Sequence, residues 1–323
     1  MNRIGSTLLL ISALLLPSMA AQAENDFPNR PITLVVAFPA GGGVDTVGRL
    51  IGKAMSEKLG QPIIIENRPG AAGQLGTTHV ARRAKADGYT LLLTSPGAAT
   101  GGPAIFPDLD YDTKRDLAAI GLVVTMPNLL VANPKFPART AADLIELAKS
   151  GQVITYGSGG VGTGQHLAGE LLAHTLGIKM LHVPYKGTAP AVIDTISGQI
   201  DLSFPDTSAI QHVRSGQLNI IGVTTAERSR ALPDLPTIAE GGASGYSAAS
   251  WYGLVAPKKT PASTINRLNE ALNHALQQPE IQETLLANGM DPTPTTPEEF
   301  QQFLEEDLER WTSLVQAIGL KAE

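Results

Sequence analysis

The sequence predicts an α/β protein of two domains with a cleft between them. Strand and helix patterns alternate along the chain with short loops, which is typical of parallel sheets covered by helices. The same order of elements occurs once in each half, and 323 residues are enough for two domains with full cores. Each half also carries a glycine-rich turn between a strand and a helix, at residues 39–43 and 157–164. These observations favour two similar domains that face each other.

The first half alternates strand, helix, strand, helix and strand. Residues 32–38 are almost continuously apolar, which predicts a strand that is covered on both faces. The helix pattern that follows ends at Gly60, because glycine commonly ends helices. The expected elements are strands at 32–38, 62–66 and 90–94, a helix at 44–59, and a helix from the glycine-rich turn at 69–73 to about residue 84.

The second half repeats this order. Thr140 is expected to cap its first helix, because a threonine hydroxyl can accept a hydrogen bond from a free backbone N–H group. A buried strand then leads into the second glycine-rich turn. The expected elements are helices at 140–150, 163–176 and 189–197, and strands at 153–156, 179–183, 201–204 and 218–224.

Two connecting stretches suggest a hinge. Residues 117–133 are apolar and interrupted by Met126-Pro127, and residues 226–250 are rich in proline, glycine and alanine. The simplest topology has the chain crossing to the second domain and returning, with the C-terminal helices packed on the first domain. The expected domains are 24–124 plus 250–323 and 125–249. A strand is expected at 251–256, and helices are expected at 262–278, 279–288 and 297–318.

Residues 1–23 have the pattern of a cleaved secretory signal peptide. Arg3 precedes a short apolar core at 8–16, and residues 21–23 form a small-x-small cleavage site. The apolar core is too short to anchor the protein in a membrane. The sequence contains no cysteine, which excludes disulfides, thiol catalysis and a lipid-anchored cysteine. We therefore expect an unanchored periplasmic protein that begins at Glu24.

The glycine-rich turns are candidate anion sites. A helix start offers unpaired backbone N–H groups and the positive end of the helix dipole, and glycine lets a ligand approach them closely. The net charge is −6 and the basic residues are dispersed, which gives no indication of binding to nucleic acid or to an anionic membrane. Two such turns suggest a cleft that closes on a small negatively charged molecule. A purely structural role for either turn stays open.

The second turn also matches the dinucleotide-binding pattern G-x-G-x-x-G at residues 157–162. That pattern requires an acidic residue at the end of the next strand, and residues 182–185 contain none. The first turn has Glu66 at the corresponding place but Thr46 instead of the last glycine. Because neither pattern is complete, we expect no dinucleotide and no other cofactor.

Several polar residues lie where strands end or helices begin. Asp45 is in the first turn of its helix, where it either interacts with the helix dipole as a cap or shapes the loop and orients a bound water or ammonium group. Ser95, Tyr185 and Asp206 follow strands, and Thr163 precedes a helix. The carboxyl ends of parallel strands line the ligand crevice in such sheets. These residues are therefore candidate site residues, although each could also serve ordinary turn chemistry.

Patterns that could indicate a metal or catalysis are weak. His166, Glu170 and His174 are spaced four residues apart, as metal ligands on one helix can be, but we favour a solvated helix edge. Residues 108–112 resemble the start of a calcium loop that lacks its glycine and its final glutamate. We therefore expect no metal. No G-x-S-x-G motif is present and nothing else points to a Ser/His/acid triad, although the residues of such a triad meet only in the fold. A secreted α/β hydrolase or dehydrogenase is the alternative from another class.

A set of motifs lies at residues 27–32, 38–45, 66–73, 87–91, 183–187, 235–237 and 296–300. Together they closely resemble one receptor family, the extracytoplasmic solute receptors of tripartite tricarboxylate transporters, or Bug receptors. The resemblance covers essentially the whole mature chain. It implies a periplasmic binding protein-like Venus-flytrap fold with a double-crossover hinge and no catalysis. It also implies a small carboxylate ligand, which would be a di- or tricarboxylate, an acidic amino acid or an aromatic acid.

The resemblance also implies partners and site residues. The partners would be the small and large membrane subunits of a secondary transporter, and we expect a monomer; a sensor for a membrane signalling partner is the alternative. The loop 38–45 is implied to hold one ligand carboxylate through backbone groups and waters, opposite the loop 158–163. The distal pocket should choose the ligand, and no evident motif gives it an Arg or Lys apart from Lys186. The expected site residues are Phe38, Ala40, Gly41, Gly42, Asp45, Ser95 and Ala98 in the first domain, and Ser158, Gly159, Thr163, Tyr185 and Asp206 in the second.

Overall fold

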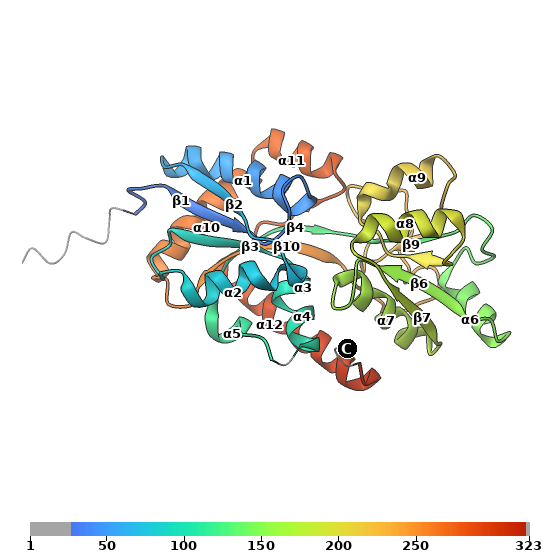
Figure 1. Ribbon diagram of the computed structural model, residues 1–323. Helices are drawn as coiled ribbons and strands as arrows, with labels where there is room; N and C mark the ends of the chain where they lie inside the picture. The colour runs from blue at the N-terminus through green and yellow to red at the C-terminus, as the bar shows by residue number, and fades with distance from the viewer. Residues whose placement is uncertain (1–26, 107, 321–323) are drawn as a thin grey trace, which may run out of the picture.

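The computed structural model describes residues 27–106 and 108–320, so the expected signal peptide and Glu24 lie outside the described part. The described chain forms two α/β halves, each built around its own sheet (Figure 1). This arrangement confirms the predicted two-domain α/β fold. No helix in these two ranges combines the length and the apolar character that crossing a membrane requires.

The first sheet has six strands in the order β11-β4-β10-β3-β1-β2. β1, β2 and β3 run parallel, as predicted. β10 runs antiparallel to β3 and β4, and β11 runs antiparallel to β4, so the complete sheet is mixed. The reason is that β10 brings the chain back from the second half. The strands are β1 (Ile32–Val36), β2 (Ile63–Asn67), β3 (Thr90–Thr94), β4 (Leu117–Met126), β10 (Ser250–Pro257) and β11 (Asp291–Pro292).

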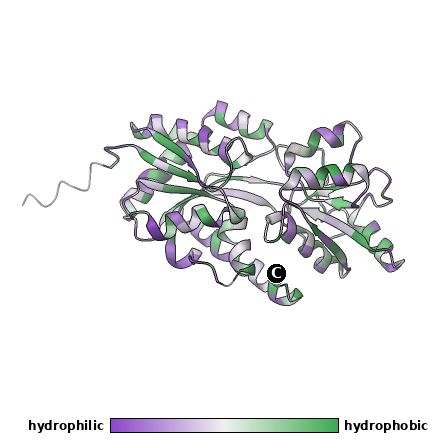
Figure 2. Ribbon diagram, in the orientation of Figure 1, coloured by the Kyte–Doolittle hydropathy of each residue, from purple (hydrophilic) through white to green (hydrophobic). Residues whose placement is uncertain are grey.

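Helices cover both faces of the first sheet, because its strands are apolar on both sides. Leu34 of β1 packs in one cluster with residues of α1 and α10, whereas its neighbour Val35 packs in another with residues of α2 and α12. Figure 2 shows the hydrophobic colour along these central strands. The helices are α1 (Gly43–Leu59), η1 (Ala71–Gly73), α2 (Gln74–Arg83), α3 (Pro96–Ala99), α4 (Gly101–Ile105), α5 (Thr113–Asp116), α10 (Ala262–Leu276), α11 (Pro279–Ala287) and α12 (Pro297–Ile318).

The second sheet has five strands in the order β7-β6-β8-β5-β9. β6 runs parallel to β7 and β8, whereas β5 runs antiparallel to β8 and β9. The predicted cap of α6 is confirmed, because Thr140 and Asp143 form a reciprocal capping box. The elements are β5 (Leu129–Ala132), α6 (Ala141–Lys149), β6 (Ile154–Ser158), α7 (Gly164–Leu176), β7 (Met180–Pro184), α8 (Thr188–Ser197), β8 (Leu202–Ser203), η2 (Thr207–Ala209), α9 (Ile210–Arg214) and β9 (Asn219–Val223).

Long strands join the two halves. β4 leads out of the first sheet, and only two residues separate its end from the start of β5 in the second sheet. The return runs through residues 224–249, which form no helix or strand, into β10. Two side-chain hydrogen bonds also link the halves, from Thr207 Oγ1 to the Asn288 carbonyl at 2.7 Å and from Ser229 Oγ to Asp291 Oδ2 at 2.8 Å. The numerical domain boundaries given above stay a prediction.

The C-terminal helix α12 departs from expectation. α10 and α11 pack on the first domain as expected, with Leu272 and Leu285 in its core. The start of α12 also packs there through Phe300, but Trp311 and Leu314 near its end belong to the core cluster of the second sheet. A helix of 22 residues is about 33 Å long, so it extends past one sheet to the next. The expectation that all C-terminal helices pack on the first domain is therefore wrong for the end of α12.

Candidate functional site

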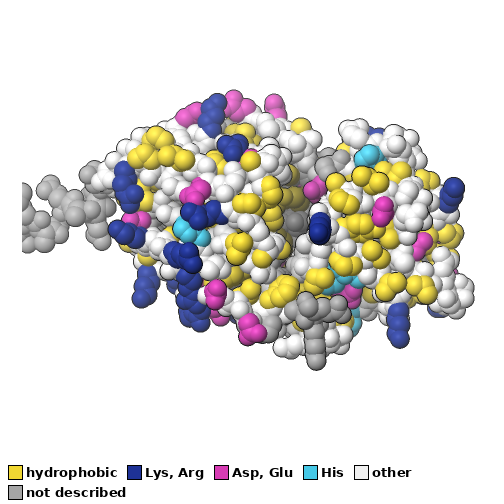
Figure 3. Space-filling model, in the orientation of Figure 1, with side chains coloured by type: hydrophobic (Ala, Val, Ile, Leu, Met, Phe, Trp, Pro, Cys, Tyr) yellow, Lys and Arg dark blue, Asp and Glu magenta, His cyan; other side chains and the backbone are white. Residues whose placement is uncertain are grey.

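A cleft of about 520 Å³ lies between the halves and is lined by residues of both. The space-filling view shows the hollow between them (Figure 3). Its size suits a small molecule. The first half contributes Phe38, Pro39, Gly42, Gly43, Val44, Ala72, Ser95, Pro96, Gly97, Ser250 and Tyr252, and the second contributes Gly159, Gly160, Val161, Thr163, Gly164, Gln165, Gly187, Thr188 and Asp206.

Helix starts from both halves converge on this cleft. Gly42 and Gly43 begin α1, Thr163 and Gly164 begin α7, and Thr188 begins α8. No side chain caps the first turn of α1 or of α8. The first N–H groups of a helix lack intrahelical partners, and the helix dipole adds positive potential there. Among the described residues, no Lys, Arg or His lines the cleft. Backbone N–H groups are therefore the source of positive potential in this cleft, whose lining also includes the Asp206 side chain.

Asp45 organises the first glycine loop (residues 38–45) from beneath. Its Oδ2 accepts hydrogen bonds from Gly41 N–H and Arg49 Nε, both at 2.9 Å, and its Oδ1 accepts one from Asn67 Nδ2 at 2.8 Å. Gly41 has φ +83°, a conformation that side-chain-bearing residues rarely adopt. The hydrogen bond from Arg49 is the main cause that lowers the pKa of Asp45 to about 2. Asp45 is only 2 % exposed and does not line the cleft, which matches the loop-shaping interpretation.

The structure brings half of the expected site residues to the cleft. Phe38, Gly42, Ser95, Gly159, Thr163 and Asp206 line it, whereas Ala40, Gly41, Asp45, Ala98, Ser158 and Tyr185 do not.

The residues outside the cleft have other contacts. Ala98 is fully buried, and its carbonyl accepts a hydrogen bond from the Tyr111 hydroxyl. Ser158 is also buried, and its Oγ lies 2.7 Å from His182 Nε2. The Tyr185 hydroxyl donates to Asp194 at 2.7 Å, and burial together with this bond raises the pKa of Tyr185 to about 12.

Sequence reasoning missed the contribution of β10. Ser250 and Tyr252 are two residues apart on this strand, so both face the cleft. A Cβ atom added to Gly43 would lie 3.3 Å from the Tyr252 hydroxyl, so Tyr252 sits against the start of α1. Burial and then the charge of Asp206 raise the pKa of Tyr252 well above its usual range. The sequence predicted a strand at 251–256 that includes Tyr252. Only the fold shows which face of this strand lies at the cleft.

His166 is not on a solvated helix edge, so that interpretation is wrong for this residue. It is 1 % exposed and stacks on His182 with ring centroids 4.0 Å apart. His174 is exposed, and Glu170 accepts a hydrogen bond from the Tyr156 hydroxyl at 2.6 Å. Within residues 27–106 and 108–320, no group of three or more acidic, histidine or cysteine side chains could hold a metal ion.

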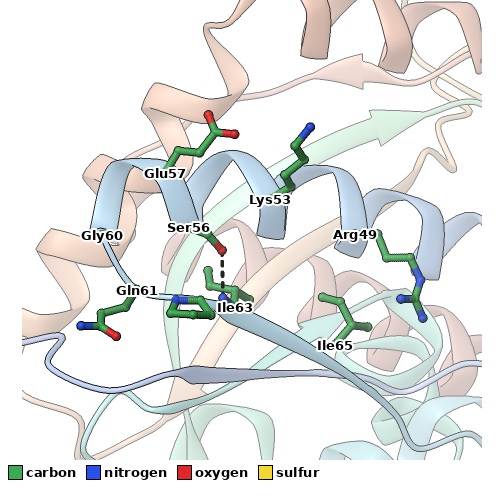
Figure 4. A pocket seen from close by; sticks show the side chains of 9 residues that line it. Arg49, Lys53, Ser56, Glu57, Gly60, Gln61, Ile63 and Ile65 are labelled. Atoms are coloured by element: carbon green, nitrogen blue, oxygen red, sulfur yellow. Dashed lines mark hydrogen bonds between the residues drawn. The ribbon is translucent and has the colours of Figure 1, made fainter.

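A second hollow lies on the outside of the first half, between α1 and β2 (Figure 4). Lys53 and Glu57 carry opposite charges on the same helix at its rim. The Ser56 hydroxyl there accepts the Ile63 N–H at 2.8 Å and so already has a backbone partner. Only one half of the molecule builds this hollow. The cleft between the halves is therefore the better candidate site.

The two sheets, the joining strands and the shared cleft form the two-domain arrangement of periplasmic binding proteins. A family described as "Tripartite tricarboxylate transporter family receptor" matches residues 47–320. The chain belongs to this family, which confirms the resemblance found in its motifs.

Solved structures of this type are similar to the chain over most of its length. The periplasmic binding protein BugD is 35% identical with a TM-score of 0.78, and the match covers 92% of this chain and 100% of that one. The R. palustris protein Rpa4515 with adipate is 33% identical with a TM-score of 0.81, covering 92% and 99%. MatC from Rhodopseudomonas palustris with bound malate is 34% identical with a TM-score of 0.77, covering 90% and 100%.

Proposed function

We propose that this receptor captures a small carboxylate in the cleft between its domains and delivers it to a secondary transporter in the membrane. The observation that carries the proposal is the convergence of uncapped helix starts from both halves on a cavity whose lining, among residues 27–106 and 108–320, includes no cationic side chain. Such N–H groups bind a carboxylate oxygen directly, without a paired Lys or Arg. The family and the similar structures are those of solute-binding proteins, which supports a binding role rather than catalysis.

The ligand class follows from the same cavity. Adipate and malate, the ligands of two similar proteins, are small dicarboxylates, and a cavity of about 520 Å³ has room for molecules of this size. The helix starts of α1 and α7 come from opposite domains, so a ligand between them would hold the domains together. We infer that a carboxylate is held on the first glycine loop and that the second domain selects the rest of the ligand.

The location and partners belong to the same proposal. Residues 1–23 would be removed on export to the periplasm, and the mature receptor would work as a monomer. The membrane partners would be the small and large subunits of a tripartite tricarboxylate transporter. Ligand-dependent co-purification of these subunits from membranes would support delivery, whereas ligand-dependent capture of a signalling kinase would support sensing instead.

Ligand binding is tested with purified mature protein and a panel of mono-, di- and tricarboxylates, aromatic acids and acidic amino acids. A ligand at about 100 times its Kd stabilises the folded state by about 2.7 kcal/mol, which a thermal-shift assay detects. Titration calorimetry then gives the affinity. No thermal shift with any member of the panel would refute the proposal.

The variant Gly42→Val tests the first glycine loop directly. A Cβ atom at Gly42 would meet only the Pro39 carbonyl, at 3.5 Å, so the fold should accept the change while the valine methyls obstruct the start of α1. Because hydrogen bonds to a charged group contribute about 1.5–3 kcal/mol, we expect a loss of affinity of about 10-fold or more. Ala40→Val adds bulk to the same loop outside the cleft and is the matched control. Equal affinities of the two variants would contradict the assignment.

A further inference from the structure

Two imidazole rings lie beneath the second glycine loop (residues 158–163), and the proposed function does not use them. His166 is on α7, and His182 is on β7, which lie next to each other in the second half (Figure 1). The rings stack at 4.0 Å with an angle of 20° between their planes. Tyr156 also stacks on His182, with ring centroids 4.9 Å apart. The pair is therefore fixed in place by its neighbours.

Each ring is bonded to the loop. His166 Nδ1 accepts the Gly162 N–H at 3.2 Å. His182 Nε2 lies 2.7 Å from Ser158 Oγ, which in turn accepts the Gly160 N–H at 3.1 Å. Gly160 and Gly162 have φ angles of +128° and +80°, which glycine adopts freely but does not prefer strongly. These bonds act together with those that the Gly160 carbonyl accepts from the N–H of Thr163 at 3.3 Å and from its Oγ1 at 2.8 Å.

The loop held in this way forms part of the cleft and meets the first domain. Gly159, Gly160 and Val161 line the cleft. A Cβ atom added to Gly162 would lie 3.0 Å from the ring of Phe106, which belongs to the first half. A shift of Gly162 would thus change both a wall of the cleft and a contact between the domains.

The bond from Gly162 requires a particular protonation state of His166. Because Nδ1 accepts a hydrogen bond, the proton of the neutral ring is assigned to Nε2, which lies 3.8 Å from Glu170 Oε1. A proton on Nδ1 would turn this nitrogen into a donor that faces another donor, the Gly162 N–H. Burial, and then His182, lower the pKa of His166 to about 3, and burial lowers the pKa of His182 to about 4. Both rings are therefore neutral at neutral pH.

The other titratable groups around the pair are consistent with two neutral histidine rings. Glu170 on α7 is hydrogen-bonded to Tyr156 of β6. Tyr246, from the segment after β9, donates to the Ala168 carbonyl at 3.0 Å. On α12, Asp307 and Arg310 pair with each other at 2.5 Å. Glu170 is thus the one carboxylate among these groups that is placed to stabilise a charged His166.

We propose that His166 and His182 are positioning residues for ligand binding: as neutral rings they hold the second glycine loop in its binding conformation, and protonation of His166 at Nδ1 releases Gly162. The inference rests on the proposed function, in which this loop forms one wall of the carboxylate site. A positive charge near the site would by itself attract an anion. Loss of the Gly162 bond acts in the opposite direction, and we expect it to dominate because the displaced loop also loses its contact with Phe106.

Binding of malate and adipate is measured by calorimetry between pH 7 and pH 3 for the mature protein and its variants, a range that reaches the pKa values of both rings. His166→Leu removes the acceptor, and we expect at least a 10-fold loss of affinity at pH 7. His166→Asn places Oδ1 near the position of Nδ1 without a titrating ring, so it should recover most of this loss and flatten the pH profile. His174→Asn, on the exposed side of the same helix, is the matched control and should follow the wild-type profile. Malate and adipate ionise in the same way in every titration. The role of the histidines is therefore judged from the differences between the pH profiles of the variants and the wild-type protein.

A ligand-free measurement separates this inference from the proposed function. The amide resonances of Gly160 and Gly162 should titrate in acid in the wild-type protein, and should not do so in the His166→Asn/His182→Gln double variant. If neither malate nor adipate binds, the choice of ligand fails while the amide titration still decides the inference. Wild-type-like affinity of His166→Leu, or tighter wild-type binding in acid than at pH 7, would overturn it. So would amide titration that is the same in the double variant.

Discussion

Replacing Asp45 with asparagine should destabilise the protein by about 2 kcal/mol without changing the shape of the side chain. The Asp45 carboxylate accepts three hydrogen bonds, from Gly41, Asn67 and Arg49. In Asp45→Asn one oxygen becomes an NH₂ group, which cannot accept. A buried donor that loses its acceptor costs about 1–3 kcal/mol. Arg49 has a side chain that is 53 % exposed, so water replaces its lost partner and the ion pair adds little.

The assay is urea unfolding of the wild-type and variant proteins at pH 7, with the free energy of unfolding extrapolated to water. Arg49→Gln is the control, because it removes only the exposed partner and should cost less than about 1 kcal/mol. A free energy of unfolding for Asp45→Asn within about 0.5 kcal/mol of wild type would refute the role of Asp45 in holding the loop.

The difference in the free energy of unfolding between the wild-type protein and Asp45→Asn should depend on pH. Hydrogen bonding from Arg49 is the main cause that lowers the pKa of Asp45 from 3.8 to about 2 in the folded protein. The folded state therefore binds this proton less readily than the unfolded state, and the stabilisation is complete above about pH 4. It is lost as the pH falls through the folded pKa of about 2. The difference between wild type and Asp45→Asn should stay constant from pH 8 to pH 5 and should shrink below pH 4.

Two further outcomes are expected. Gly253→Ala should lower stability by about 1–3 kcal/mol, because a methyl group on β10 would overlap the Phe300 ring of α12; an unchanged melting temperature would contradict this packing. Expression with export should give a protein whose intact mass corresponds to an N-terminus at Glu24, whereas a mass that retains residues 1–23 would contradict the expected cleavage.

The secondary structure was predictable from local patterns. The apolar run at 32–38 became β1, the helix pattern at 44–59 became α1 with Gly60 as its left-handed cap, and Thr140 capped α6. These features depend on residues close together in the chain, so they can be recognised in the sequence. The antiparallel direction of β10 was not predictable in this way, because it depends on the path of the chain between the two halves.

The candidate site was predictable only in part. Phe38, Gly42 and Thr163 lie at a strand end or at helix starts, and the structure places them at the cleft. Tyr252 was missed, because a tyrosine in a predicted strand can face the core, the solvent or a ligand. Ala98 was expected at the site but is buried, since its short helix turns that residue inward.

The sequence by itself determined that two glycine-rich helix starts exist, that each follows a buried strand, and that the chain has the motifs of a tripartite tricarboxylate receptor. Turn residues and strand periodicity depend on neighbours in the sequence, so they can be recognised without knowledge of the tertiary contacts. Only the tertiary structure decided that both helix starts open into one cleft and that Asp45 and the His166–His182 pair support the loops from beneath. The physical reason is that burial and contact across α7, β7 and β10 arise from packing between segments that are distant in the sequence.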